Sequence, residues 1–346
     1  GRVMTWVQGM VVKRERDIRS FEKMPFYRVL GEASIGSGFM TLEWKATEGS
    51  AYYNSPALYK ENGLKQREDA EKLIASLPQR GVIDGIEKKK EKKNAPLLYN
   101  LAEAQNDCSK YFKISPKETL DIIQNLYERK LVTYPRTDAR VLSSAIAKEI
   151  DKNIRGLQNL PWAAPYAADI LSEGRHKGIE KTRYTNDKQI TDHYAIIPTG
   201  QGLSALNGLD GRSVRVYEII VRRFLAIFYP PAEYEKVSLS VLLGTEHFYA
   251  SDKYIKKDGY LSVMQYSFKV PKKGENENSA TAEGNPANLK KDEGNAPEGQ
   301  PAEDADDSGS DSETNESLRE NVGLLKKGGP LPCARMAYIQ NDHERL

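Results

Sequence analysis

The sequence predicts an α+β protein of several domains, in which a discontinuous β domain is interrupted by a mainly helical segment. Residues 25–47 and 82–86 alternate in a strand pattern, residues 96–231 follow helical spacing, and strand patterns return after residue 232. A chain of 346 residues has room for two or three domains. The sequence has no run of about 18 apolar residues, so we expect a soluble protein that does not interact with membranes.

Charge is unevenly distributed along the chain. Residues 271–318 contain 4 Lys/Arg and 13 Asp/Glu, a net charge of −9, whereas the whole chain carries +2, so the remainder carries +11. A basic body of this kind favours polyanions, most commonly nucleic acid. Residues 271–318 also contain no aromatic residue, valine or isoleucine, and we expect them to form a disordered acidic insert in which Asp304 and Asp306 do not form a metal site.

Cysteine content and the N-terminal sequence indicate the compartment. Cys108 and Cys333 are too few for a disulfide framework or a zinc site, and Cys108 is expected to be a core residue. The first residues do not have the pattern of a signal peptide. These features predict a cytoplasmic protein.

The β domain is expected to have short helices beside its strands. Residues 11–18 form an amphipathic pattern, residues 66–77 a short helix, and the basic run at 88–93 is expected to be a solvated hinge. After the helical segment, strands are predicted at Tyr234–Leu243, His247–Ser251 and Tyr260–Phe268.

Two capped helices precede the most informative motif. Asn100 with Glu103, and Ser115 with Glu118, have the spacing of capping boxes. The second helix has an apolar stripe that predicts core positions at Leu120, Ile123, Leu126 and Tyr127. A later helix is expected to be capped by Ser213, with Arg222 and Arg223 off its apolar stripe.

The second helix leads into residues 131–142, which read LVTYPRTDARVL. Pro135 imposes an extended or turn geometry on Tyr134, and Arg136 follows two residues later. A guanidinium can bind phosphate oxygens while a phenol attacks phosphorus. The alternative interpretation is a half-buried tyrosine beside a turn, with Arg136 as a surface charge.

The string Thr-Tyr-Pro-Arg-Thr-Asp at residues 133–138 resembles the active-site signature of type IA DNA topoisomerases, particularly the topoisomerase III branch. The resemblance implies that Tyr134 forms a 5′-phosphotyrosine link to single-stranded DNA and that Arg136 positions the scissile phosphate. The sequence DHYAIIPT at residues 192–199 is similar to a histidine motif of the family, which makes His193 the third catalytic candidate, although Tyr194 replaces a second histidine.

Other segments extend the resemblance. Residues 1–6 are similar to a segment of the family that lines its single-strand groove, with Met4 and Trp6 replacing glutamine and proline. The lysine-rich run and residues 217–231 also match. The DNA-contacting residues that the resemblance implies are Arg2, Lys92, Lys93, Thr137, Asp138 and Arg140.

The resemblance also implies the arrangement of a toroid, in which a barrel-like β arch carries a helical, tyrosine-bearing domain. The expected parts are a remnant of the base domain at 1–21, the arch at 22–95 and at 232–270 with 319–338, the tyrosine domain at 96–231, and the acidic insert at 271–318.

The family's toprim domain, whose carboxylates hold Mg²⁺, has no counterpart in this sequence. We therefore expect a fragment that binds single-stranded DNA as a monomer but is inactive alone, and whose further partners could belong to DNA recombination or plasmid-transfer machinery. The main alternative is a non-catalytic single-stranded nucleic-acid-binding module. A nuclease or relaxase with a metal-bound histidine cluster is disfavoured because the four histidines are dispersed.

Overall fold

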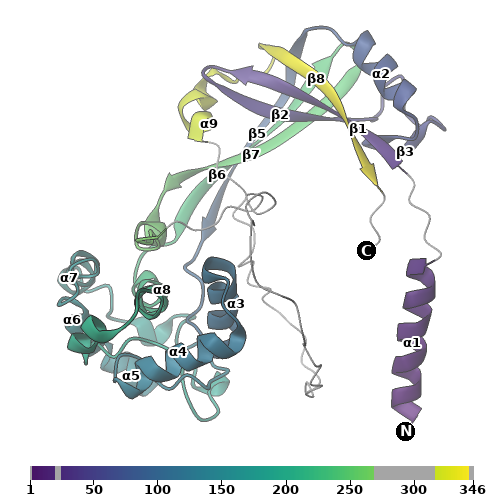
Figure 1. The fold of residues 1–346 in the computed structure, drawn as a ribbon. Helices are drawn as coiled ribbons and strands as arrows, with labels where there is room; N and C mark the ends of the chain where they lie inside the picture. Colours follow the sequence, from purple (N-terminus) through teal and green to yellow (C-terminus); the bar gives the residue numbers. More distant parts are fainter. Residues whose placement is uncertain (1, 20–24, 269–315, 343–346) are drawn as a thin grey trace. The chain divides into compact units, whose positions relative to one another are not determined.

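The computed structural model describes residues 2–19, 25–268 and 316–342. The chain divides into two compact units (Figure 1). The β unit comprises Gly1–Glu91, Tyr234–Lys256 and Glu313–Leu346, and the helical unit comprises Lys92–Glu233 and Lys257–Ser312. None of the described helices is both long and apolar enough to cross a membrane.

The β unit is built around a closed ring of strands. Its elements are α1 (Arg2–Arg19), β1 (Pro25–Ile35), β2 (Gly38–Lys45), β3 (Leu58–Lys60), β4 (Gly63–Leu64), α2 (Arg67–Ser76), β5 (Arg80–Lys93), β6 (Ala232–Leu243), β7 (Glu246–Lys257), α9 (Glu316–Asn321), a 3-10 turn (Val322–Leu324) and β8 (Pro330–Asp342). Hydrogen bonding runs in the order β2-β7-β6-β5-β8-β1, and β1 also pairs with β2, which closes the ring. The basic run at 88–93 is therefore part of strand β5, not a hinge.

The ring joins segments that are distant in the sequence. β1 and β2 form a hairpin in which Ile35 faces Gly38, and Gly36 takes a φ of 57° at the turn. β8 pairs antiparallel with β1 from Pro25↔Asp342 onward, with a bulge between Glu32 and Ala33. The final described strand thus lies between β1 and β5.

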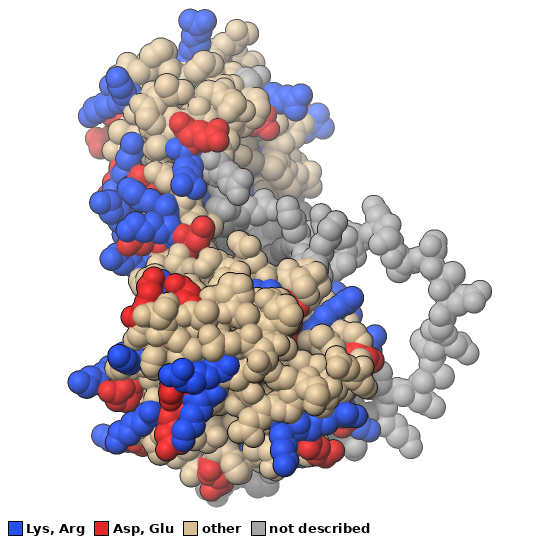
Figure 2. Space-filling view, turned by 90° about the vertical axis from the view of Figure 1, so that its left-hand side faces the viewer, with Lys and Arg blue, Asp and Glu red and all other residues tan. Residues whose placement is uncertain are grey.

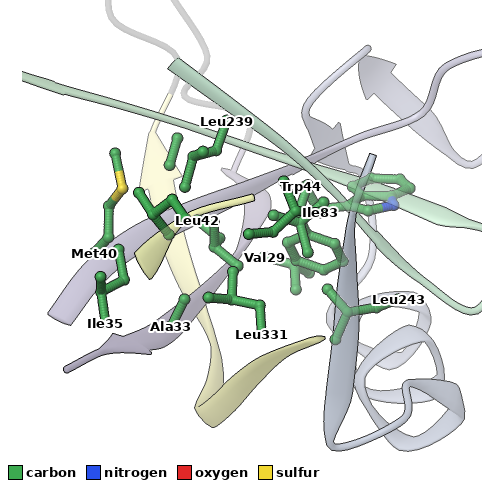
Figure 3. Close-up of a cluster of buried hydrophobic side chains, with 14 of the residues drawn as sticks. Val29, Ala33, Ile35, Met40, Leu42, Trp44, Ile83, Leu239, Leu243 and Leu331 are labelled. Carbon is green, nitrogen blue, oxygen red and sulfur yellow. The ribbon is translucent and has the colours of Figure 1, made fainter. Parts of the chain in front are cut away.

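The core of the β unit lies inside this ring (Figure 3). Met40, Leu42 and Trp44 alternate along β2 and are buried, as expected for a strand with one face turned inward. The buried carboxylate of Glu246 accepts hydrogen bonds from Trp44 Nε1 at 2.7 Å and from Ser50 Oγ at 2.6 Å. Burial of this charge is tolerated because its oxygens are hydrogen-bonded.

The helical unit contains α3 (Leu101–Phe112), α4 (Pro116–Glu128), α5 (Ser144–Lys148), α6 (Ile150–Leu157), α7 (Ala164–Ser172), α8 (Gly211–Ala226) and 3-10 turns at Ile179–Lys181, Asp187–Gln189, Leu203–Gly208 and Gly259–Ser262. Both predicted caps are confirmed: Asn100 accepts from the Glu103 amide at 2.9 Å and Ser115 from the Glu118 amide at 3.1 Å. Cys108 is a core residue, as predicted.

The prediction that Ser213 caps α8 is wrong. The helix is capped by Asp210, not Ser213, because the Asp210 carboxylate accepts hydrogen bonds from the Arg212 and Ser213 amides at 2.8 and 3.0 Å. Arg222 and Arg223, which the sequence places off the apolar stripe, are buried as well, because α8 is buried on almost every side and both guanidinium groups have carboxylate partners.

The strand predicted at Tyr260–Phe268 is also wrong. This segment begins with a 3-10 turn and continues in turns. Its carbonyl groups bind side chains instead of a neighbouring strand: Ser262 O accepts from the Tyr166 hydroxyl at 3.0 Å and Val263 O from Arg222 Nη1 at 2.9 Å. Of the predicted acidic insert, only residues 316–318 are described, at the start of α9; Asp304 and Asp306 lie outside the described residues.

Candidate active site around Tyr134

The loop that carries Tyr134 is fixed by pairing with residues 195–199. It leaves α4 through Leu131 and Val132, which are both buried. Val132 forms an isolated antiparallel bridge with Pro198. The Thr133 amide donates to Ile197 O at 3.0 Å, and the Thr133 hydroxyl accepts from the Ile197 amide at 2.9 Å. These contacts hold the residue preceding the tyrosine in a defined conformation.

Pairing of the two segments brings Tyr134 next to His193. Their ring centroids are 4.4 Å apart, and the ring planes are inclined by 45°. Tyr134 is half-buried and His193 is exposed. Two of the three predicted catalytic residues therefore lie side by side, with an imidazole within reach of a group bound at the phenol.

A third ring, that of Tyr127, also contacts Tyr134. It comes from the last turn of α4 and meets Tyr134 edge to face, with centroids 5.4 Å apart and planes at 79°. The prediction that Tyr127 is a core residue is wrong, because the residue is 39% exposed. Tyr127 and Leu126 both have the spacing of the apolar stripe of α4, but Leu126 is buried and Tyr127 is not. The contact of Tyr127 with Tyr134 depends on tertiary structure and could not be read from this spacing.

Arg136, the third predicted catalytic residue, is exposed two positions after Tyr134. Within the described residues its guanidinium makes no ion pair or hydrogen bond. Asp138 is also exposed, and its carbonyl accepts a hydrogen bond from Asn100 Nδ2 at 3.0 Å. The loop thus presents a free guanidinium that could bind the oxygens of a phosphate.

Thr137 and Arg140 have partners within the protein. Thr137 is buried, and its hydroxyl donates to His193 O at 2.8 Å. Arg140 lies 3.5 Å from the Glu103 carboxylate, and its Nε donates to Leu98 O at 3.4 Å. Direct DNA contacts by these two side chains stay predictions.

The other predicted DNA-contacting residues belong to separate parts of the chain. Lys92 Nζ lies 3.5 Å from Glu233 Oε1, and Lys93 also has an interaction partner. Arg2 is the first residue of α1, and its side chain is outside the described residues. Figure 2 shows acidic side chains among the groups of basic ones, so the surface in this view is not uniformly basic.

A buried network behind the site was not predicted from the sequence. Tyr99 forms a bridge with Ile196, and its carbonyl accepts from the Ile196 amide at 2.7 Å. The Tyr99 hydroxyl donates to Asp107, which also pairs with Arg223 Nη2 at 2.9 Å. The Arg223 guanidinium lies 4.4 Å from the centroid of the Tyr99 ring. Burial raises the pKa of Tyr99 well above its usual value, so this phenol stays protonated and serves as a donor.

The described residues contain no group of three or more His, Cys, Asp or Glu side chains that could hold a metal ion. The site around Tyr134 consists of a phenol, a guanidinium and an imidazole. It therefore fits a phosphodiester substrate better than a metal ion.

Comparisons with known proteins point in the same direction. A model of the DNA topoisomerase family matches residues 1–308. DNA topoisomerase 3 of Bacillus licheniformis is 36% identical over 271 residues, which cover 77% of this chain and 34% of that protein. The protein of the same name from Bacillus subtilis is 36% identical over 267 residues, covering 76% and 34%. This chain therefore spans about a third of the length of these curated relatives.

The fold comparison agrees with the sequence comparison. The full-length topoisomerase I structure from Thermotoga maritima aligns with a TM-score of 0.56 at 16% identity, covering 99% of this chain and 45% of that one. At this identity the match supports the fold alone. The family match covers most of the sequence and includes the Tyr134 loop. The chain belongs to the type IA DNA topoisomerase family and is topoisomerase III-like.

Proposed function

We propose that this chain supplies the tyrosine half of a type IA topoisomerase site, which cleaves and rejoins single-stranded DNA and so permits strand passage in the complete enzyme. The observation that carries the proposal is the contact of the Tyr134 and His193 rings at 4.4 Å, with the guanidinium of Arg136, which has no partner among the described residues, two positions further along the chain. In this proposal the outcome for the complete enzyme is relaxation of negative supercoils and decatenation.

The proposed reaction is a phosphoryl transfer to Tyr134. The phenol oxygen attacks phosphorus, the phenol loses its proton, and the bond between phosphorus and the 3′ oxygen breaks. The 3′ oxygen takes up a proton and becomes a free hydroxyl, while the 5′ phosphate stays on the tyrosine. Because the tyrosyl ester retains the phosphodiester character of the bond, attack by the 3′ hydroxyl reverses the step without ATP.

Arg136 and His193 have separate roles in this scheme. A phenol ordinarily ionises near pH ~10 and is a weak nucleophile at neutral pH. The Arg136 guanidinium would favour phenolate character and neutralise charge developing on the phosphate oxygens. His193 would donate a hydrogen bond to the phosphate or assist proton transfer.

The larger arrangement is part of the proposal. The β unit would form the arch and the helical unit the tyrosine domain of a toroid. In the complete enzyme Mg²⁺ would be held by the carboxylates of a toprim domain, as the resemblance to the family implies. We expect the chain alone to bind single-stranded DNA as a monomer without relaxing supercoiled DNA, and relaxation by this chain with Mg²⁺ would contradict that expectation.

The test uses a chimera in which this whole chain, including strand β8, replaces the matching segment of the Bacillus subtilis DNA topoisomerase 3. A single-stranded oligonucleotide labelled at its 3′ end is incubated with the chimera and Mg²⁺, and the reaction is stopped with detergent. We expect the label to become attached to the protein. The adduct should be lost in Tyr134→Phe and should still form in Tyr194→Phe, the matched control. Failure to form an adduct, or an adduct that persists in Tyr134→Phe, would overturn the proposal.

A further inference from the structure

We propose that Thr137 is a positioning residue whose hydroxyl holds His193 against the ring of Tyr134. The catalytic consequence rests on the proposed function above, but the positional claim concerns only this chain. The resemblance to known topoisomerases led us to expect that Thr137 contacts DNA. Its surroundings in the structure indicate a different role.

The Thr137 side chain is only 7% exposed, and its hydroxyl is engaged in both directions. It donates to His193 O at 2.8 Å and accepts from the Ala139 amide at 3.1 Å. Little of this hydroxyl's hydrogen-bonding capacity is left for a phosphate. A buried group of this kind acts through the residues that it fixes.

The segment that carries His193 has few other attachments. The Ile190 amide donates to Asp187 O at 3.3 Å, and the next backbone anchor is the Ala195 amide, which donates to Val141 O at 3.0 Å. Between these two positions, the bond from Thr137 to His193 O is the one hydrogen bond from this segment to the rest of the described chain. The position of the imidazole therefore depends on Thr137 and on the ring contact with Tyr134.

Thr133 makes an equivalent pair of contacts on the other side of Tyr134. Its hydroxyl donates to Ala195 O at 3.0 Å and accepts from the Ile197 amide at 2.9 Å. Thr133 lies one residue before Tyr134 and Thr137 three residues after it, and both hydroxyls donate to carbonyl groups of the segment that contains His193. Thr133 fixes the part of that segment that is already bridged, whereas Thr137 fixes the part that has no other hydrogen bond to the rest of the described chain.

The position of His193 can be measured without DNA. The His193 ring protons lie against the Tyr134 ring and should carry a ring-current shift in the proton NMR spectrum of the full chain. The chain has four histidines, so His193→Gln identifies the resonances and Tyr134→Leu gives their positions without the ring. We expect Thr137→Val to lose at least half of the shift, and Thr137→Ser, which keeps the hydroxyl, to retain it.

Thr182→Val is the matched control. The Thr182 hydroxyl also donates to a carbonyl, Ile179 O at 2.8 Å, and accepts from an amide, that of Tyr184 at 3.3 Å. This variant should leave the His193 resonances unchanged. If Thr137→Val does not fold, Thr137→Ala supplies the same comparison with a smaller side chain. Wild-type His193 shifts in a folded Thr137→Val or Thr137→Ala protein, or their loss in Thr137→Ser, would overturn the proposal.

Two further measurements separate positioning from DNA contact. A positioning role predicts that Thr137→Val leaves single-stranded DNA affinity unchanged in fluorescence anisotropy but slows adduct formation in the chimera as much as His193→Gln does, with no added loss in the double variant. Weaker binding with unmoved His193 resonances would instead assign Thr137 to DNA. Because the NMR comparison involves neither DNA nor cleavage, failure of the proposed function would leave its result intact.

Discussion

The ring of Tyr127 meets the ring of Tyr134 edge to face, with a centroid separation of 5.4 Å. Tyr127 belongs to α4, whose N-terminus is capped by Ser115, so the contact connects the nucleophile candidate to a regular helix. Together with His193, Tyr127 limits the directions in which the Tyr134 ring can turn. Aromatic pairs of this geometry contribute roughly 0.5–1.5 kcal/mol beyond the area they bury.

Replacement of Tyr127 by leucine should slow adduct formation in the chimera by about 2- to 10-fold, the range that corresponds to loss of such a ring contact. Tyr127→Phe keeps the ring and should be close to wild type. The measurement is the initial rate of adduct formation with the 3′-labelled oligonucleotide. Equal rates for the leucine and phenylalanine variants would show that the ring contact does not orient Tyr134.

Arg136 should affect DNA binding and leave folding unchanged. Since its guanidinium has no partner among the described residues, Arg136→Ala should shift the free energy of unfolding by no more than about 0.5 kcal/mol. Loss of one phosphate contact should lower the slope of log affinity against log salt by about 1. Fluorescence anisotropy with single-stranded DNA at several salt concentrations measures that slope.

Arg155 provides the control for Arg136. It is an exposed arginine of α6 that is paired with Asp151 at 3.3 Å. Arg155→Ala should leave the salt slope unchanged. If both alanine variants lower the slope equally, the effect comes from net charge and not from a phosphate contact at Arg136.

The buried pair of Asp107 and Arg223 should be important for stability. Asp107→Asn leaves the Arg223 guanidinium buried without a countercharge, which typically costs about 3–5 kcal/mol. Urea unfolding followed by circular dichroism measures the loss. Glu149→Gln is the control, because Glu149 forms an exposed pair with Lys152 and its replacement should change the unfolding midpoint little. An equally small effect of Asp107→Asn would contradict a stabilising role of the buried pair.

The two cysteines should report separately on the two units. Burial raises the pKa of Cys108, in the helical unit, from 9.0 to about 12. Because the folded pKa lies above the unfolded one, the stability from keeping this thiol neutral is present below pH ~9 and is lost as pH rises toward ~12. Cys333, in the β unit, is only half-buried.

At pH 8, iodoacetamide should therefore modify Cys333 before Cys108 in the native protein, and urea should accelerate the modification of Cys108. Mass spectrometry of proteolytic fragments gives the rate at each site. Cys333→Ser is the control that isolates Cys108. Rapid native modification of Cys108 would show that the helical unit opens far more readily than its packing suggests.

Features that depend on residues close together in the sequence could be predicted. Capping by Asn100 and Ser115 depends on residues three positions apart, and both caps are present. The loop around Tyr134 could be identified because several residues of one motif are contiguous. The fold class of helices together with a large antiparallel sheet also follows from local periodicity.

Features that depend on distant contacts could not be predicted. Arg223 is buried because Asp107, on another helix, supplies its countercharge. Residues 260–268 have the composition of a strand, yet the guanidinium of Arg222 takes the Val263 carbonyl that a neighbouring strand would need. Tyr127 has the spacing of a core residue. It is exposed and contacts the Tyr134 ring, which the spacing along α4 alone does not indicate.

The order of the strands has a consequence for synthesis of the protein on the ribosome. β1 leads the ring, but its neighbour β8 lies far along the sequence, since Pro25 pairs with Asp342 and Ala33 with Cys333. During translation the edges of β1 and β5 that bind β8 stay open until β8 emerges. The helical unit, whose described segments all precede β8, can complete its folding earlier, so an emerging chain should expose two unpaired strand edges that chaperones could protect.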